Sequence, residues 1–140
     1  MKKKIFWIVS YPKSGNTWMR AILTSLFFTK DGVFSIELFK STSIFEHAER
    51  FEFIKETNSS DYNKLSQIDM LSKYWIEAQN KTVIKGDFAF LKTHHACIKY
   101  YSNDFTSINN SLGAVYLVRD PRDIAISYSK HMGKTIDETI

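Results

Sequence analysis

The chain lacks several features that would place it in common classes of protein. Its 140 residues include one cysteine, Cys97, which excludes an internal disulfide bond and predicts a reducing compartment. No apolar run approaches the roughly 18 residues of a membrane-spanning helix. The start, MKKKIFWIVSY, is similar to a secretory signal, but its apolar part, Ile5–Val9, is shorter than the roughly 7–15 residues that a signal needs. We therefore expect a cytoplasmic protein with no membrane segment.

A strong charge of one sign is also missing. Lys and Arg number 19 against 15 for Asp and Glu, a net charge of +4. This mild excess does not indicate a nucleic-acid-binding protein, and it suits either a slightly basic surface or one pocket for an anionic ligand. No group of His, Cys and acidic residues has the spacing of metal ligands, so no metal site is predicted. The length and an apolar content of 44% predict one packed domain over residues 1–140.

Three short apolar runs predict buried strands at Ile5–Val9, Phe88–Leu91 and Ala114–Val118. The stretch Trp18–Phe28 is apolar on most sides and has no Pro or Gly, so it predicts a buried helix. Strands that alternate with helices predict an α/β fold, with a parallel sheet flanked by helices and ligands bound beyond the carboxyl ends of the strands.

The middle of the chain predicts two further helices. Ser43 and Glu46 have the spacing of a capping box, which would open the first of them. Three apolar residues would share one face of that helix: Ile44, Ala48 and Phe51. Residues 57–61 are polar and predict a loop, and Lys64–Gln79 has apolar residues at helical spacing, which predicts an amphipathic helix.

The third predicted strand runs into the segment RDPRD. Asp120 suits the cap of a helix, Pro121 its first position and Asp123 its first turn, while Gly133 suits its end. An acid directly after a strand also occurs in metal sites. We favour the helix cap for Asp120 because Pro121 and Asp123 complete a helix start.

Ionisable residues follow all three predicted strands: Lys13, His94 and Arg119. The carboxyl ends of parallel strands meet at one edge of a sheet, so these residues predict a site there. Lys13 belongs to the segment SYPKSGNTW, residues 10–18, which lies between a strand and a helix, as phosphate-binding loops do.

Each residue of this loop has a feature that suits an anion. Gly15 lets the backbone approach closely, Lys13 supplies a full charge, and three side chains add donors: Ser14, Asn16 and Thr17. The loop fails the nucleotide motif G-x-x-x-x-G-K-[ST], because GNT stands where GKT would be and the lysine lies upstream. A small P-loop kinase is therefore a less favoured alternative, and an ordinary turn with a surface lysine is another.

Three segments together resemble one known family. YPKSGNTW is similar to the phosphosulfate-binding loop of sulfotransferases that use 3′-phosphoadenosine 5′-phosphosulfate (PAPS), usually Y-P-K-[SA]-G-[TN]-T-W. YLVRDPRDIAISY is similar to the family's 3′-phosphate motif, in which a serine stands eight residues after an arginine, as Ser127 and Arg119 do. LKTHH resembles the K-T-H segment between them. The resemblance spans residues 5 to about 132 and implies a bacterial-type member with a P-loop-like fold.

This resemblance implies roles for the loop. A sulfuryl group would move from PAPS to an acceptor hydroxyl or amine, leaving adenosine 3′,5′-bisphosphate (PAP). Lys13 would stabilise charge on the leaving 5′-phosphate, which is held by the loop N–H groups at Gly15 and Asn16 and the hydroxyls of Ser14 and Thr17. Trp18 would stack on the adenine; its helical pattern alone would favour a core aromatic.

The other two segments receive roles in the same way. His94 would take the acceptor's proton, with His95 as a weaker alternative on the opposite face of the strand. Lys92 would contact the sulfuryl group in transit, or be a solvated lysine. Arg119 would bind the 3′-phosphate in bidentate fashion, and the Ser127 hydroxyl would add a hydrogen bond.

The chain is shorter than members of this family, so we expect it to lack the C-terminal part of the usual domain. Three strands leave a sheet incompletely covered, which predicts an exposed apolar edge or face and favours a homo-oligomer. The alternatives to an active enzyme are a non-catalytic module that binds PAP and, less favoured, the kinase. The acceptor would be a small molecule or a glycan, which no stretch of the sequence identifies.

Overall fold

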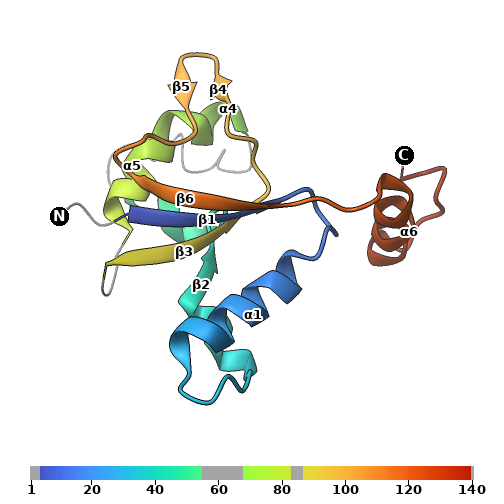
Figure 1. Cartoon of the computed structure of the whole chain (residues 1–140). Helices are drawn as coiled ribbons and strands as arrows, with labels where there is room; N and C mark the ends of the chain where they lie inside the picture. The colour runs from blue at the N-terminus through green and yellow to red at the C-terminus, as the bar shows by residue number, and fades with distance from the viewer. Residues whose placement is uncertain (1–3, 55–67, 83–86, 140) are drawn as a thin grey trace.

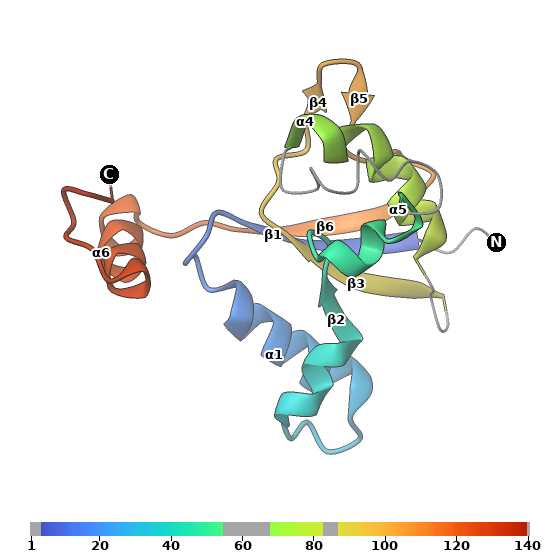
Figure 2. The same cartoon turned by 180° about the vertical axis from the view of Figure 1, so that it is seen from behind.

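The computed structural model describes residues 4–54, 68–82 and 87–139. Four parallel strands form the main sheet, in the order β2 (Thr42–Ile44), β3 (Phe88–Thr93), β1 (Lys4–Ser10) and β6 (Ser111–Leu117). Helix α1 (Asn16–Phe28) lies on one side of this sheet, and α4 (Ile68–Leu71) and α5 (Trp75–Lys81) lie on the other (Figures 1 and 2). The predicted fold class is therefore confirmed.

The remaining elements are short, except for the last helix. Two-residue strands β4 (Lys99–Tyr100) and β5 (Asn103–Asp104) form an antiparallel hairpin, and α6 (Pro121–Met132) follows the sheet. Short 3-10 helices occupy Ile36–Ser41, Ala48–Phe51 and Ser72–Tyr74. No helix of the described residues is long and apolar enough to cross a membrane.

The three predicted strands are confirmed, but the sheet has a fourth strand where a capped helix was predicted. Ser43 and Ile44 lie on β2 and pair with Leu91 and Lys92 of β3. The Glu46 side chain accepts hydrogen bonds from the end of β3, so it does not close a capping box. The capping-box prediction is wrong because the pattern considers only adjacent residues, whereas pairing with the distant strand β3 decides the structure of this segment.

The second middle helix is confirmed in part. Residues 57–61 and 64–67 lie outside the described residues. From Ile68 to Lys81 the chain is helical in three consecutive pieces: α4, a 3-10 turn and α5. Trp75 and Ala78 of α5 are buried against the sheet, as their helical spacing predicts.

The core lies between the sheet and α5. Trp7 of β1 packs edge-on against Phe45, at a centroid distance of 5.3 Å, and lies 5.1 Å from the ring of Phe105. The ring of Trp75 lies 5.2 Å from that of Phe105 and joins α5 to this cluster. These rings are at most 3% exposed, which anchors the strands whose ends carry the predicted site.

Helix α1 forms as predicted, but it is not a buried helix. Only Asn16 and Thr24 are buried. Phe27 and Phe28 contact Phe90 of β3, while the outer face holds residues that are largely exposed. These are Trp18 (77%), Ile22 (51%) and Leu26 (68%). The burial prediction is wrong because one side of the helix meets the sheet and no described element covers the other.

Helix α6 begins and ends as predicted. Asp120 accepts a hydrogen bond from the N–H of Arg122 at 2.9 Å, Pro121 is the first helical residue, and Gly133 ends the helix at a φ of +66°. The helix stands clear of the sheet on an extended link (Figures 1 and 2). One face of β6 is exposed along the strand, at Leu112 (53%) and Tyr116 (66%), and Val118 (78%) directly after the strand is exposed as well. The expected exposed apolar face is confirmed, and self-association stays a prediction.

Candidate functional site

The loop between β1 and α1 has a backbone suited to an anion. Lys13 and Gly15 have left-handed conformations, with φ of +66° and +99°. Gly15 stands at the start of α1, and among the described residues no side chain caps the helix and its first turn has no acid. The first helical hydrogen bond runs from Met19 N–H to the Gly15 carbonyl, so within the described residues the N–H groups of the first turn, at Asn16, Thr17 and Trp18, have no partner inside the helix.

Two polar side chains of this loop are buried. Ser14 is 9% exposed, and within the described residues its Oγ has no hydrogen-bond partner. Asn16 uses both amide hydrogens inside the protein, with Nδ2 donating to the Ile8 carbonyl at 3.2 Å and to Ser10 Oγ at 3.1 Å. The Asn16 side chain therefore fixes the loop to β1, and it would meet a ligand through its backbone N–H.

The first turn of α1 places two other predicted residues at the surface. Thr17 is exposed, and Trp18 is 77% exposed. A core role for Trp18, which the helical pattern alone favoured, is therefore wrong. An exposed indole beside an open helix start is free to stack on a planar ligand.

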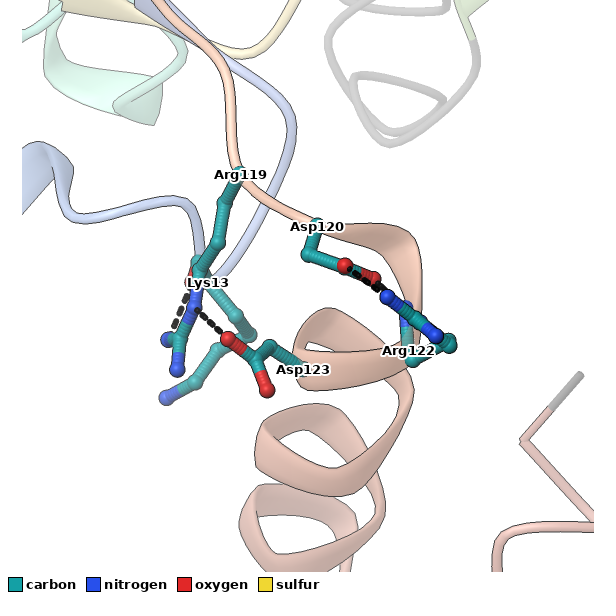
Figure 3. Close-up of polar contacts among 5 residues, drawn as sticks. All are labelled: Lys13, Arg119, Asp120, Arg122 and Asp123. Carbon is teal, nitrogen blue, oxygen red and sulfur yellow. Dashed lines mark hydrogen bonds and ion pairs between the residues drawn. The ribbon is translucent and has the colours of Figure 1, made fainter.

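Arg119 lies against the same loop, although it is 106 positions from Lys13 in the sequence. Its Nη1 donates to the Lys13 carbonyl at 3.2 Å, and its Nε lies 3.5 Å from a carboxylate oxygen of Asp123. Figure 3 shows the charged ends of Lys13 and Arg119 on the same side of the loop. The structure thus brings together the basic residues of the first and last motifs.

Within the described residues, three other members of the last motif take no part in this contact: Asp120, Arg122 and Ser127. Arg122 pairs with Asp120 at 2.6 Å and points away from Lys13 (Figure 3). This pairing, together with the N–H of Arg122, lowers the pKa of Asp120. Ser127 is half-buried on α6, and within the described residues no hydrogen bond joins its side chain to Arg119. Asp120 is thus the cap of α6, as predicted.

His94 lies beside the loop at the end of β3. Its Nδ1 is 2.6 Å from the Ser10 carbonyl oxygen and 3.4 Å from Ser10 Oγ. A carbonyl oxygen only accepts, so Nδ1 carries the hydrogen and Nε2 carries the free lone pair. Partial burial lowers the pKa of His94 and nearby Lys92 adds to this, while the Ser10 carbonyl and Glu46 oppose it. The ring is therefore neutral at neutral pH and can accept a proton at Nε2.

Lys92 and His95, the other two predicted residues of this segment, lie on opposite faces of the strand, as predicted. Lys92 pairs in register with Ile8 of β1 and shares the His94 face. Burial lowers the pKa of Lys92, Arg20 lowers it further, and Glu46 opposes both. The His95 ring lies on the core side, 5.4 Å from the ring of Trp75. Burial also lowers the pKa of His95.

The sulfotransferase domain model matches residues 3–138 of the chain. The chain belongs to the sulfotransferase family. No curated protein and no solved structure matches it. The resemblance carried by the three segments is thereby confirmed, and the parallel α/β sheet agrees with the P-loop-like fold of the family.

One residue of the site, Glu46, was not predicted from the sequence. Glu46 Oε1 accepts the backbone N–H of His94 at 2.7 Å and the Thr93 hydroxyl at 2.5 Å. Burial acts to raise the pKa of Glu46, but these hydrogen bonds outweigh it and lower the pKa, so the side chain is ionised at neutral pH. The signal was present: Ile44 and Phe45 are a short apolar run directly before an acid, which is the strand-end pattern that identified His94 and Arg119.

The protein has a hollow of about 1030 Å³ elsewhere, along β2 and the first residues of β3. Its walls include Arg50, Lys81 and Phe88. Lys13, His94 and Arg119 do not line it, so we assign the site to the loop edge, where the charges and open N–H groups lie. Among the described residues, no group of three or more His, Cys, Asp or Glu could hold a metal ion.

Proposed function

We propose that this sulfotransferase moves a sulfuryl group from PAPS to an acceptor hydroxyl or amine and releases PAP. The acceptor oxygen or nitrogen bonds to sulfur, and the bond from sulfur to the 5′-phosphate oxygen breaks with its electron pair staying on that oxygen. The acceptor's proton passes to Nε2 of His94. The proposal takes residues 1–140 as one PAPS-binding domain that works in the cytoplasm on a small molecule or a glycan, without a metal.

The observation that carries the proposal is the contact between Arg119 and the Lys13 carbonyl. It places two cations from opposite ends of the chain at one loop, as a nucleotide with phosphates at two positions requires. A guanidinium can bind a phosphate through two parallel hydrogen bonds, and an ammonium acts as a point charge. We therefore assign the 3′-phosphate to Arg119 and the 5′-phosphate to Lys13.

The loop itself fits a phosphate. The buried Ser14 Oγ has no partner within the described residues, so a ligand oxygen would satisfy a group that is otherwise costly to bury. Apart from its chain neighbours and its own helix backbone, no atom of the described residues lies within 4 Å of the position that a Gly15 Cβ would occupy, which leaves room for close approach of the ligand to the backbone. The positive end of α1 and the open N–H groups add attraction for the anion.

Three residues carry the proposed chemistry: Lys13 and Lys92 supply positive charge, and His94 supplies the base. Negative charge develops on the leaving 5′-phosphate oxygen, so the Lys13 ammonium stabilises the transition state more than the ground state. His94, held neutral, accepts the acceptor's proton. Lys92, on the same face as His94, is assigned to the sulfuryl oxygens.

Arg119 is available for this role because its present partners hold it weakly. Its ion pair with Asp123 joins side chains that are 42% and 57% exposed, and exposed pairs of this kind contribute about 0–1 kcal/mol. A phosphate can replace Asp123 at little cost. Ser127 stands one turn after Asp123 on α6, on the helix face that Arg119 contacts, and its hydroxyl is assigned to the same phosphate.

A non-catalytic module that binds PAP is the second candidate, and the position of α6 favours it. Helix α6 stands clear of the sheet (Figures 1 and 2), and three side chains of the site are exposed to solvent: Thr17, Trp18 and His94. Transfer of labelled sulfate from PAPS to any acceptor, water included, would decide for the enzyme. Binding of PAP with no transfer would decide for the module.

Calorimetric titration tests the nucleotide site directly. We expect wild-type protein to bind PAP more tightly than ATP. Arg119→Ala should weaken PAP binding by about 10- to 150-fold, the loss expected for hydrogen bonds to a charged group. Arg122→Ala is the matched control, since Arg122 is close in sequence but pairs with Asp120, and it should leave PAP affinity unchanged. PAP binding no tighter than ATP, or unaffected by Arg119→Ala, would refute the site.

A further inference from the structure

Glu46 differs from the other acids near the site because its carboxylate is shielded and accepts hydrogen bonds from the last residue of β3 and the residue that follows it. Its Oε1 accepts the His94 backbone N–H and the Thr93 hydroxyl. Its Oε2 is buried and has no hydrogen-bond partner within the described residues. Burying a carboxylate costs desolvation free energy, so we expect the hydrogen bonds of Glu46 to hold a functionally important part of the chain in place.

What these contacts fix is the turn that follows β3. Two donors from consecutive residues, Thr93 and His94, converge on one oxygen of Glu46. The Thr93 oxygen in turn accepts the backbone N–H of His95 at 3.0 Å. The chain therefore leaves the strand in a single conformation, with the His94 ring on one side of the sheet and the His95 ring on the other.

The ring of His94 is fixed separately, from β1. Its Nδ1 donates to the Ser10 carbonyl, and Ser10 Oγ also accepts from Asn16 of the loop. The Ser10 carbonyl therefore holds the ring of His94, and Glu46 holds the backbone of the same residue. A backbone anchor and a ring anchor thus act together, and the free atom of the imidazole is Nε2.

We propose that Glu46 is the positioning residue of His94, which it holds by the backbone so that Nδ1–H meets the Ser10 carbonyl and Nε2 stays free as the base. The assignment of His94 as the base rests on the proposed function, while the positioning itself does not. The carboxylate also places a negative charge near the imidazole. Lys92 on the same strand is the other titratable side chain that acts on His94, and His94 in turn acts on the neighbouring His95.

Three variants separate the hydrogen bond from the charge. Glu46→Ala removes both, Glu46→Gln keeps an oxygen that accepts the His94 N–H but loses the charge, and Glu49→Gln removes an exposed carboxylate nearby. Amide hydrogen exchange reports the backbone bond. Nuclear magnetic resonance of the imidazole nitrogens reports the tautomer and the pKa of His94, assigned with a His94→Gln variant.

The wild-type ring should carry its hydrogen on Nδ1. In Glu46→Ala, the His94 amide should exchange about 10- to 100-fold faster, as expected when a charge-assisted hydrogen bond is lost, and the Nδ1–H tautomer should lose its dominance. In Glu46→Gln, exchange should stay near the wild-type rate while the pKa of His94 falls, because the charge that favoured the imidazolium is gone. Glu49→Gln should change neither, and PAP affinity should be unchanged in all three.

Two results would overturn the positioning role. One is an Nε2–H tautomer in wild-type protein, and the other is a His94 amide in Glu46→Ala that exchanges at the wild-type rate. The first remains measurable even if Glu46→Ala fails to fold. Failure of PAP to bind wild-type protein would refute the proposed function alone, because the exchange rate and tautomer of His94 are measured without nucleotide.

Discussion

Trp18 offers a prediction in which binding and stability respond differently. The indole is 77% exposed on the first turn of α1, so Trp18→Ala removes little buried area. We expect the free energy of unfolding to change by no more than about 0.5 kcal/mol, as for other surface substitutions. Stacking of a base on an aromatic ring contributes about 1–3 kcal/mol, so PAP affinity should fall by about 5- to 150-fold.

Trp75 provides the matched control in the same chain. It is 1% exposed in the core, and Trp75→Ala should lower the free energy of unfolding by about 3–5 kcal/mol. Urea denaturation of both variants measures stability, and calorimetry of Trp18→Ala measures PAP affinity. A Trp18→Ala protein that loses as much stability as Trp75→Ala, or that binds PAP as wild type does, would refute the stacking role.

Two further predictions concern the loop and the acid stability of the fold. Gly15→Ala should lower the free energy of unfolding by about 1–2 kcal/mol in urea denaturation, because a φ of +99° strains any residue that has a Cβ. An unchanged free energy of unfolding would contradict this backbone conformation. The pKa of Glu46 is lower in the folded protein than its usual 4.5, so the stability it contributes is present above that value and is lost as the pH falls through the folded pKa. Denaturation below about pH 4.5 should therefore show a steeper loss of stability in wild type than in Glu46→Gln, and parallel curves would contradict the lowered pKa.

Local patterns in the sequence predicted the parts of the structure that local forces decide. The start of α6 follows from Asp120 and Pro121, and its end from Gly133, because capping and left-handed φ are properties of a few adjacent residues. The strand ends that carry Lys13, His94 and Arg119 follow from short apolar runs bounded by polar residues. Alternation along β3 correctly separated the faces of His94 and His95.

The errors arose where contacts between distant segments decide the structure. The segment around Ser43 has a helix-cap pattern, yet it pairs with β3, and Glu46 binds Thr93 some 47 positions away. The apolar content of α1 suggested burial on all sides, whereas the sheet covers only one. No pattern within α6 indicates that it stands clear of the sheet, because its own capping is satisfied in either position.

Lys13 and Arg119 should bind different phosphates of one nucleotide. Titration of each variant with each monophosphate tests this most directly. Wild-type, Lys13→Ala and Arg119→Ala proteins would each be titrated with PAP, adenosine 5′-phosphate and adenosine 3′-phosphate. We predict that Arg119→Ala weakens binding of PAP and the 3′-phosphate but not of the 5′-phosphate, and that Lys13→Ala does the reverse. Equal losses for both monophosphates in each variant, or no loss in either, would contradict the assignment of a separate phosphate to each side chain.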